Sequence, residues 1–335
     1  MKTVISTDRA AAVELLREGE IVALPTETVY GLAADALNPI AVAKIFEAKE
    51  RPRFDPLIVH LPNRDWLEKI VNLPAQNRKL ILKLADKFWP GPFTMVLPKR
   101  DIVHDIVTAG LDTVAVRISA HPVFAKIDRE LDHPLAAPSA NRFGHVSPTT
   151  AQHVLDELDG RTPLIIDAGP TQHGIESTIV VVRDGKIEIL RRGPVTAEQL
   201  SEFAEIDVAA IRPKISAPGQ LPSHYAPKTP LRLIDHAELF SPEKNQHVGL
   251  LAWHPLSRKR VLRNVRRQAG DRRSLKFAAV RKLSEKKDLR EAAANLFRYL
   301  RELDQSAVDL IVAERVPSHG LGAAILDRLE RASHG

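Results

Sequence analysis

The chain contains no cysteine, and this absence excludes two kinds of stabilising site. A chain without thiols has neither a disulfide framework nor a thiolate metal site. No apolar run approaches the ~20 residues that a membrane-spanning helix requires. The N-terminal stretch from Met1 to Arg9 lacks the apolar segment and small-residue cleavage site of a secretory signal. We therefore expect a cytoplasmic protein with no membrane contact.

Two common nucleotide-binding signatures and the usual metal motifs are also missing. The sequence has no Gly-x-x-x-x-Gly-Lys-Ser/Thr phosphate loop and no Gly-x-Gly-x-x-Gly after a predicted strand. Its histidines are scattered, with no His-x-x-x-His pair and no cluster with carboxylates at ligand spacing. We predict no transition-metal site, and any nucleotide must be bound by another arrangement of donors.

Positive charge is concentrated in one C-terminal segment. Residues 256–290 hold 14 Lys or Arg and three acidic residues, a net charge of +11, whereas the whole chain carries +6. Such a run is usually a solvated surface or a loop. Binding of tRNA and docking of an acidic partner are the alternatives, because basic patches supply sequence-independent affinity for nucleic acid. Phe277 is the one aromatic residue in this segment, which argues against base stacking.

The length of 335 residues predicts two domains, because single cores rarely grow beyond ~250–300 residues. In the first part, helical periodicity alternates with short β-rich runs. Asp184-Gly185 separates the predicted strands 178–182 and 186–191 and is a hairpin signal, so at least one antiparallel pair is expected. The other predicted elements are helices at 9–18 and 39–49 and strands at 21–24, 57–60, 94–97, 114–118 and 164–166. This mixture predicts an α/β fold on a twisted, partly antiparallel sheet.

A proline-rich linker and a smaller domain are expected to follow. Residues 211–230 contain five prolines and almost no periodicity. The runs 231–234, 248–252 and 310–313 resemble buried parallel strands, and 288–303 and 323–332 resemble helices. We predict a C-terminal open α/β (Rossmann-like) domain, with boundaries at 1–205 for the first domain, 206–230 for the linker and 231–335 for the second domain.

Two N-terminal segments together predict an anion-binding site. Pro25–Gly31 (Pro-Thr-Glu-Thr-Val-Tyr-Gly) follows an apolar run, so its hydroxyls lie where a buried strand ends and backbone donors become available. Lys49–Leu57 carries Lys49, Arg51 and Arg53, with Glu50 and Asp55 as the only local acidic partners. A polyanion such as phosphate is expected to balance these charges.

These two segments, with four further motifs in the same order, resemble the threonylcarbamoyl-AMP synthases. These YrdC-like enzymes begin the threonylcarbamoylation of the tRNA adenosine beside the anticodon. The further motifs are Val114–Arg117, Ala137–Asn141, Glu176–Val180 and Leu190–Gly193. Ala217-Pro218-Gly219 with His224–Pro227 is similar to the linker of the long form, which carries a second domain. The resemblance spans nearly the whole chain and implies a YrdC-like twisted mixed α/β sheet in the first domain.

The resemblance implies a role for individual residues. Arg117 matches the arginine that holds the carboxylate of L-threonine, a bidentate task that suits a guanidinium. The rest of the L-threonine pocket matches Thr28, His60, Ala137 and Ser177. The residues that match the ATP-binding positions are Arg51, Asp55, Thr113, Ser139, Asn141, Ser147, Arg191 and Tyr225. Lys49, Arg51 and Arg117 are the candidate catalytic residues.

The implied reaction condenses L-threonine, bicarbonate or CO2, and ATP into threonylcarbamoyl-AMP and pyrophosphate. Magnesium is expected to arrive with ATP, held mostly by phosphates and water. Tyr225 is expected to reach from the linker toward the nucleotide as part of a lid. Between Gly219 and His224 the linker lacks the basic residues that the family usually carries. A downstream tRNA threonylcarbamoyl transferase is the implied partner.

Two other functions fit parts of the pattern. A non-catalytic double-stranded RNA or tRNA-binding module would explain the cations, but not an amino-acid pocket made by Thr28, His60, Arg117 and Ser177. A carbamoyl-transfer domain of the HypF type shares the fold and an adenylate intermediate. Those proteins carry zinc-binding cysteines and an acylphosphatase-like region, and this chain has neither.

Overall fold

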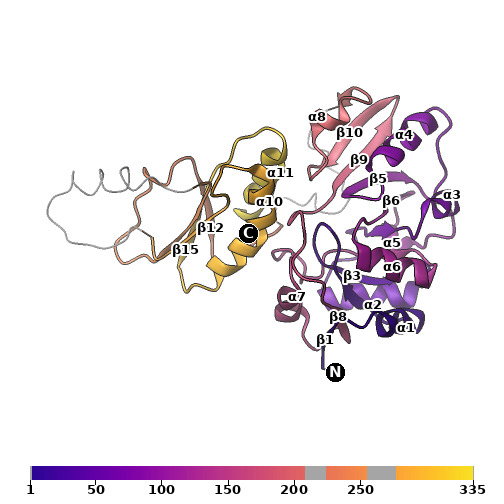
Figure 1. Ribbon diagram of the computed structural model, residues 1–335, viewed down its shortest axis with the longest axis horizontal. Helices are drawn as coiled ribbons and strands as arrows, with labels where there is room; N and C mark the ends of the chain where they lie inside the picture. Colours follow the sequence, from indigo (N-terminus) through magenta and orange to yellow (C-terminus); the bar gives the residue numbers. More distant parts are fainter. Residues whose placement is uncertain (1, 208–223, 255–276, 335) are drawn as a thin grey trace. The chain divides into compact units, whose positions relative to one another are not determined.

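The computed structural model describes residues 2–207, 224–254 and 277–334, which form two compact units. The first unit comprises Met1–Phe143 and Ser147–Leu221, and the second comprises Gly144–Val146 and Pro222–Gly335 (Figure 1). The predicted α/β class with two domains is confirmed. The boundaries at 205 and 230 stay a prediction, because residues 208–223 lie outside the described part of the chain.

The first unit is built on a mixed sheet of eleven strands in the order β1-β8-β2-β3-β7-β4-β6-β5-β9-β10-β11. The strands are β1 (Val4–Ser6), β2 (Val22–Leu24), β3 (Gly31–Asp35), β4 (Ile58–His60), β5 (Phe93–Pro98), β6 (Thr113–Arg117), β7 (Leu135–Ala136), β8 (Leu164–Ile166), β9 (Thr178–Arg183), β10 (Lys186–Arg191) and β11 (Ile206–Asp207). The helices are α1 (Arg9–Arg17), α2 (Pro39–Lys49), η1 (Arg64–Trp66), α3 (Leu67–Ile70), α4 (Arg78–Phe88), α5 (Asp105–Thr108), α6 (Pro122–Leu131), α7 (Ala151–Leu158) and α8 (Ala197–Leu200). The expected antiparallel hairpin is β9–β10, and its turn residues Asp184 and Gly185 both have positive φ, as a tight primed turn requires.

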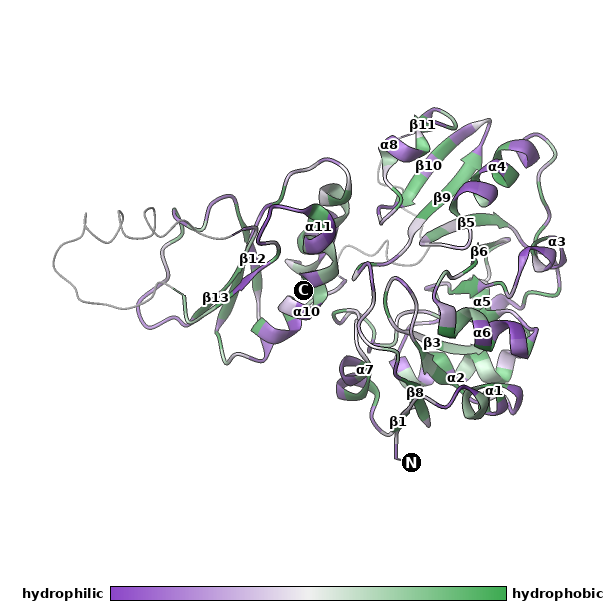
Figure 2. Ribbon diagram, in the orientation of Figure 1, coloured by the Kyte–Doolittle hydropathy of each residue, from purple (hydrophilic) through white to green (hydrophobic). Residues whose placement is uncertain are grey.

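Local sequence signals define several helix ends. Asp8 and Asn38 accept hydrogen bonds from the first backbone amides of α1 and α2, which satisfies donors that have no partner inside the helix. Helix α2 ends at Lys49, and Glu50 follows in the left-handed conformation with a φ of 53°. Figure 2 shows hydrophobic and hydrophilic residues sharing helices such as α4 and α6, whereas β9 and β10 are mostly hydrophobic. These helices therefore have one side suited to the core.

The two faces of the central strands differ in what they contact. On one face, residues such as Val59, Met95, Val116 and Val180 belong to the main core together with residues of helices α2 to α5 and α7. On the other face, Ile58, Val96, Ala115, Ile179 and Val181 form a small cluster of strand residues, with Leu190 packed against it. Among the described residues, no helix contributes to this second cluster. We call this surface the strand face, and it forms the floor of the candidate site.

The second unit contains a four-stranded parallel sheet in the order β12-β15-β13-β14. Its elements are β12 (Leu231–Ile234), β13 (Val248–Ala252), β14 (Ala279–Lys282), α10 (Leu289–Asp304), β15 (Leu310–Glu314) and α11 (Leu321–Ala332). The predicted open α/β domain is confirmed, and β14 is a strand that the sequence analysis missed. Residues 256–276 of the basic segment lie outside the described part, while Arg281 and Lys282 form ion pairs with Glu302 and Glu285. No helix that the structure describes is both long and apolar enough to cross a bilayer.

Asp128 on α6 is a buried carboxyl that we expect to limit the stability of the first unit. It is 2% exposed, and burial raises the pKa of its carboxyl well above the usual value. The folded chain therefore keeps a proton that the unfolded chain loses above pH ~4, so stability falls as the pH rises through this range. Asp128→Asn, which stays neutral, is expected to raise the free energy of unfolding at pH 7 by about 1 kcal/mol or more. Urea unfolding at pH 7 and pH 4 measures this gain, which should shrink at pH 4.

The matched control for Asp128 lies on the same helix. Glu130 is an exposed acidic residue, so Glu130→Gln should leave the stability of the folded chain nearly unchanged at both pH values. A gain from Glu130→Gln equal to that from Asp128→Asn would contradict the explanation by burial.

Candidate active site

The register of β4 and β6 brings His60 and Arg117 side by side. The strands are parallel, with Ile58 opposite Ala115 and His60 opposite Arg117. Because side chains alternate along a strand, His60 and Arg117 lie on the strand face that also carries Ile58 and Ala115. Both are almost completely buried, at 2% and 3% exposed. Two predicted threonine-pocket residues that are distant in sequence are therefore neighbours.

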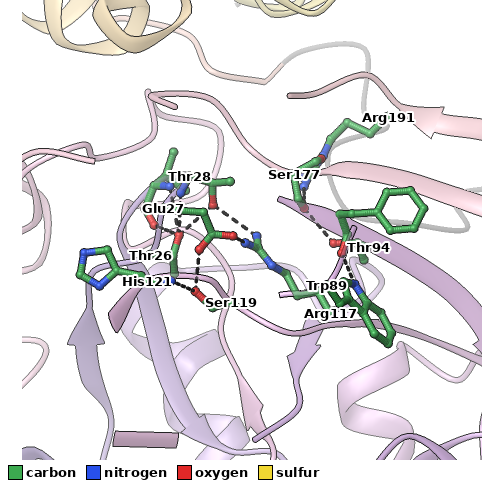
Figure 3. A network of polar contacts seen from close by, with 12 residues as sticks. Thr26, Glu27, Thr28, Trp89, Thr94, Arg117, Ser119, His121, Ser177 and Arg191 are labelled. Atoms are coloured by element: carbon green, nitrogen blue, oxygen red, sulfur yellow. Dashed lines mark hydrogen bonds and ion pairs between the residues drawn. The ribbon is translucent and has the colours of Figure 1, made fainter. Parts of the chain in front are cut away.

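Arg117 is held by the loop that joins β2 to β3. Its guanidinium forms a buried ion pair with Glu27 and donates a hydrogen bond of 3.3 Å to the Thr28 hydroxyl (Figure 3). Ser119 donates a hydrogen bond of 2.6 Å to the other carboxylate oxygen of Glu27. The Arg117 charge lowers the pKa of Glu27 even though burial acts in the opposite direction. Glu27 is therefore ionised at neutral pH.

The same loop is shaped by the hydroxyl of Thr26. It donates to the carbonyl of Val29 at 2.6 Å and accepts from the backbone amides of Thr28 and Val29 at 3.1 and 3.2 Å. Local bonds of this kind are typical of Ser and Thr in turns. They orient Glu27 and Thr28 toward Arg117, which explains the hydroxyl-rich motif after the strand.

A second group of hydroxyls lies on the neighbouring strands. Thr94 of β5 is hydrogen-bonded to Ser177 through their hydroxyls at 2.8 Å, and Arg191 donates to the Ser177 carbonyl and hydroxyl at 3.0 and 3.1 Å (Figure 3). Met95 pairs with Val116 in the antiparallel register, so Thr94 follows beside Arg117. Ser177 thus links the arginine at the end of β10 to the region of Arg117.

The predicted cationic segment folds into a buried cluster around one carboxylate. The Lys49 ammonium donates to the carbonyls of Ser139, at 2.6 Å, and Asn141. Arg51 is ion-paired with Asp55 at 2.8 Å and donates to the Pro56 carbonyl at 2.8 Å. Burial raises the pKa of Asp55, while the charges of Arg51, Lys49 and Arg191 act against that rise. Three cations therefore surround one acidic group.

Lys49 and Arg53 differ from the sequence expectation of three equivalent fixed charges. Lys49 is 1% exposed, and burial, reinforced by the Arg51 charge, lowers the pKa of its ammonium well below the usual value. Arg53 is exposed and does not join Lys49 and Arg51 in the buried cluster. Glu50 pairs with Arg161 at 2.7 Å. The buried cluster therefore contains two basic side chains of this segment and one of β10.

The remaining predicted positions lie at the ends of strands or in the loops of the first unit. Ala137 follows β7, and its backbone amide donates to the Ile58 carbonyl at 3.0 Å. Thr113 begins β6, two residues before Ala115, and pairs with Pro98 of β5. Ser147 donates to the Glu176 carboxylate. The first unit therefore contains all predicted ATP and threonine positions except Tyr225.

Tyr225 belongs to the second unit. It is 1% exposed, stacks on Phe297 with 5.5 Å between ring centroids, and lies beneath the Arg328 guanidinium at 5.3 Å. Its φ of 65° lies in the left-handed region, which is rare for a bulky residue and is often found at functional positions. Its expected role toward the nucleotide stays a prediction.

Four buried groups were not assigned a role from the sequence. Glu27 and Glu176 stand inside recognised motifs, whereas Thr94 and Ser119 lie outside them. The sequence could have indicated Glu27 as a site residue, because a carboxylate stands there between two threonines directly after a buried strand. Nothing local marked Thr94 or Ser119, because each meets its partner only after the strands pair.

His60 should make the stability of the first unit sensitive to acid. Neither ring nitrogen makes a hydrogen bond of standard geometry among the described residues, and burial with the nearby Arg117 charge lowers its pKa well below 6.5. Below pH 6.5 the unfolded chain gains a proton that the folded chain excludes, so stability is lost as the pH falls. His60→Gln should reduce this loss by up to about 1.4 kcal/mol per pH unit, measured by urea unfolding between pH 7.5 and 5.5. The exposed His104→Gln is the control, and an equal change there would contradict the prediction.

The strand face, bordered by a buried arginine and a cluster of basic side chains around Asp55, defines an α/β protein with a polar, basic site on its sheet. A family model described as "Telomere recombination" matches residues 14–193, and one described as "Threonylcarbamoyl-AMP synthase, C-terminal domain" matches residues 195–334. The threonylcarbamoyl-AMP synthase of Bacillus subtilis is 40% identical over 97% of this chain and 93% of its own length. That of Pyrococcus abyssi is 38% identical over 96% of this chain and 93% of its own.

Solved structures agree with these relatives. The crystal structure of P. abyssi Sua5 complexed with L-threonine superposes with a TM-score of 0.81 at 35% identity, covering 99% of this chain and 98% of the other. The chain belongs to the threonylcarbamoyl-AMP synthase family. The resemblance stated from the motifs is confirmed, and so is the expectation of an enzyme.

Proposed function

We propose that the protein is an L-threonylcarbamoyladenylate synthase, a nucleotidyltransferase that acts in threonylcarbamoyl modification of tRNA. The observation that carries the proposal is the link through Ser177. This residue is bonded to Arg191 of the cationic cluster and to Thr94 beside Arg117. This link supports adjoining sites for an amino-acid carboxylate and for a polyphosphate on one sheet. A binding module for nucleic acid has no use for the first of these.

L-threonine is assigned to the end of the strand face where Arg117 and His60 lie. Arg117 is the carboxylate ligand, because its buried Nε has no hydrogen-bond partner among the described residues and is available to an incoming oxygen. His60 is neutral and Ser177 carries a hydroxyl, so both suit the polar groups of an amino acid. Thr28 and Ala137 complete the proposed pocket.

ATP is assigned to the cationic end of the strand face. Lys49, Arg51 and Arg191 are the basic groups for its phosphates, and a bound polyphosphate would favour the charged form of the buried lysine, whose pKa burial lowers. Asp55, Thr113, Ser139, Asn141 and Ser147 are the polar groups at the border. The apolar floor of Ile58, Ala115 and Val181 suits the face of a base. Tyr225 remains proposed as a lid residue.

Magnesium is proposed to arrive with ATP. The described residues contain no group of three or more metal-ligating side chains, and Asp55, the carboxylate in the cluster, is paired with Arg51. This donor set fits an ion held mainly by phosphates and water. When bound, the ion supplies neutralisation of the phosphate charge.

The chemistry that we assign needs no covalent enzyme intermediate. The threonine amine loses a proton and bonds to CO2, which forms a carbamate. A carbamate oxygen then attacks the α-phosphorus of ATP, and the bond to the leaving pyrophosphate breaks. Arg117 fixes the carboxylate so that the amine is oriented, while Lys49, Arg51 and Arg191 stabilise the charge that develops on pyrophosphate.

Pyrophosphate release from ATP tests the function directly. We expect release only when L-threonine and bicarbonate are both present. Release that is indifferent to L-threonine, or absent altogether, would overturn the proposal and favour the RNA-binding alternative. A tRNA threonylcarbamoyl transferase is the proposed downstream partner.

Contact of the basic segment 256–290 with tRNA is a separate proposal. The test is the salt dependence of tRNA binding. It is measured for the full chain and for a variant in which the lysines and arginines of 256–276 are replaced by glutamine. Equal, shallow slopes would contradict it. A cytoplasmic location stays a prediction.

A further inference from the structure

We propose that Glu27 is a specificity-determining residue that makes the amino-acid subsite electrically neutral and receives the ammonium group of the substrate. The site would then accept an α-amino acid as a zwitterion and reject the same acid without its amine. The inference rests on the proposed function, because it concerns the ligand assigned to Arg117. Glu27 lies inside a family motif, but the resemblance assigned it no role.

The first step concerns the unused donors of Arg117. A guanidinium has five N–H donors. In the protein, Glu27 and Thr28 accept from the two terminal nitrogens, while the buried Nε has no partner among the described residues. Arg117 therefore keeps capacity for a second carboxylate while it remains paired with the first.

The second step concerns the acceptor capacity of Glu27. Arg117 donates to one carboxylate oxygen and Ser119 donates to the other. An ionised carboxylate offers about four lone-pair sites, so each oxygen can accept a further bond. The pair thus offers donors to a carboxylate and acceptors to an ammonium group, the two charged groups of an amino acid (Figure 3).

The charged side chains of the subsite nearest Glu27 balance one another. Arg117 and Glu27 cancel, and burial lowers the pKa of both His60 and His121, which keeps these rings neutral. His173, the other titratable residue near Glu27, also contributes a backbone amide that donates to the Glu27 carbonyl at 2.9 Å. A zwitterion adds no net charge to this buried site. A plain carboxylate adds a negative charge that the Arg117–Glu27 pair does not compensate, which is costly in a desolvated environment.

A purely structural role for Glu27 predicts a different result. If Glu27 only held Arg117 in place, its loss would weaken every carboxylate ligand to the same degree. Under our proposal its loss acts selectively, because the subsite changes from neutral to positive. The ammonium then loses its anionic acceptor, while a plain carboxylate meets an arginine whose charge Glu27 no longer balances.

Calorimetric titration of the full chain with two ligands separates these roles. The ligands are L-threonine and 2,3-dihydroxybutanoate, in which a hydroxyl replaces the amine. For the unmodified protein we expect L-threonine to bind roughly 30-fold or more tightly than the hydroxy acid, on the scale of a buried charge contact. Glu27→Gln should remove most of this preference, by weakening L-threonine and strengthening the hydroxy acid. Ser119→Ala is the matched control, since it removes the other partner of Glu27 without a change of charge, and it should keep the preference.

The outcomes distinguish this inference from the proposed function. If the unmodified protein fails to bind L-threonine, the proposed function fails. If it binds both ligands within about threefold, the role of Glu27 is wrong, whether or not Glu27→Gln folds. If Glu27→Gln weakens both ligands equally, Glu27 is only a positioning residue for Arg117 and the inference is overturned.

Discussion

Arg117→Met is expected to lower the free energy of unfolding by about 3–5 kcal/mol and to abolish threonine-dependent pyrophosphate release. The loss of stability arises because Glu27, which is 4% exposed at its side chain, would keep a buried charge without its partner. The loss of activity arises because the proposed carboxylate ligand is gone. Urea unfolding and the pyrophosphate assay measure the two effects.

A double variant separates these two consequences. Glu27→Gln together with Arg117→Met replaces the buried pair by neutral groups, and it should recover most of the lost stability. Activity should stay absent, because no cation then faces the substrate carboxylate. Recovery of activity in the double variant, or a single variant as stable as the unmodified protein, would contradict the role of the pair.

Lys49→Met is expected to reduce turnover by roughly 100- to 1,000-fold, the scale found for the loss of one electrostatic donor to a developing charge. Lys49 also bonds the carbonyls of Ser139 and Asn141, so its loss should loosen the turn that carries two proposed ATP residues. We therefore expect the KM for ATP to rise while the affinity for L-threonine changes little. Steady-state kinetics with each substrate varied in turn measures this.

The control for Lys49 is the neighbouring cation that the structure leaves outside the cluster. Arg53 is exposed, and Arg53→Met should change turnover by no more than about twofold, in line with screened surface charges. Equal effects at both positions would mean that only the net charge of the segment matters, and the assignment of Lys49 would be wrong.

The sequence predicted best those features that depend on neighbours along the chain. Asp184-Gly185 specified the β9–β10 hairpin, and the helix Pro39–Lys49 has its own apolar residues and a cap directly before it at Asn38. The strands that were missed, such as β3 and β7, are short or rich in Ala and Gly. Such runs have weak strand preference and pair because the surrounding sheet buries them.

The motifs alone also determined the family, because six short segments in a fixed order are a signal that survives without coordinates. They marked Lys49, Arg51 and Arg117 as residues of one site. They left open how those charges are balanced. That depends on the partners that each cation meets after folding.

Only the tertiary structure decided those partners. The Glu27–Arg117 ion pair joins residues 90 positions apart, and the Thr94–Ser177 hydrogen bond joins residues 83 positions apart. No local sequence pattern predicts these two contacts, because strand order and register bring the residues together. The same pairing buries Lys49 and leaves Arg53 exposed, although both are cations of one short segment. The sequence by itself therefore determined the family and marked candidate site residues, and the sheet determined which of their charges are paired inside the protein.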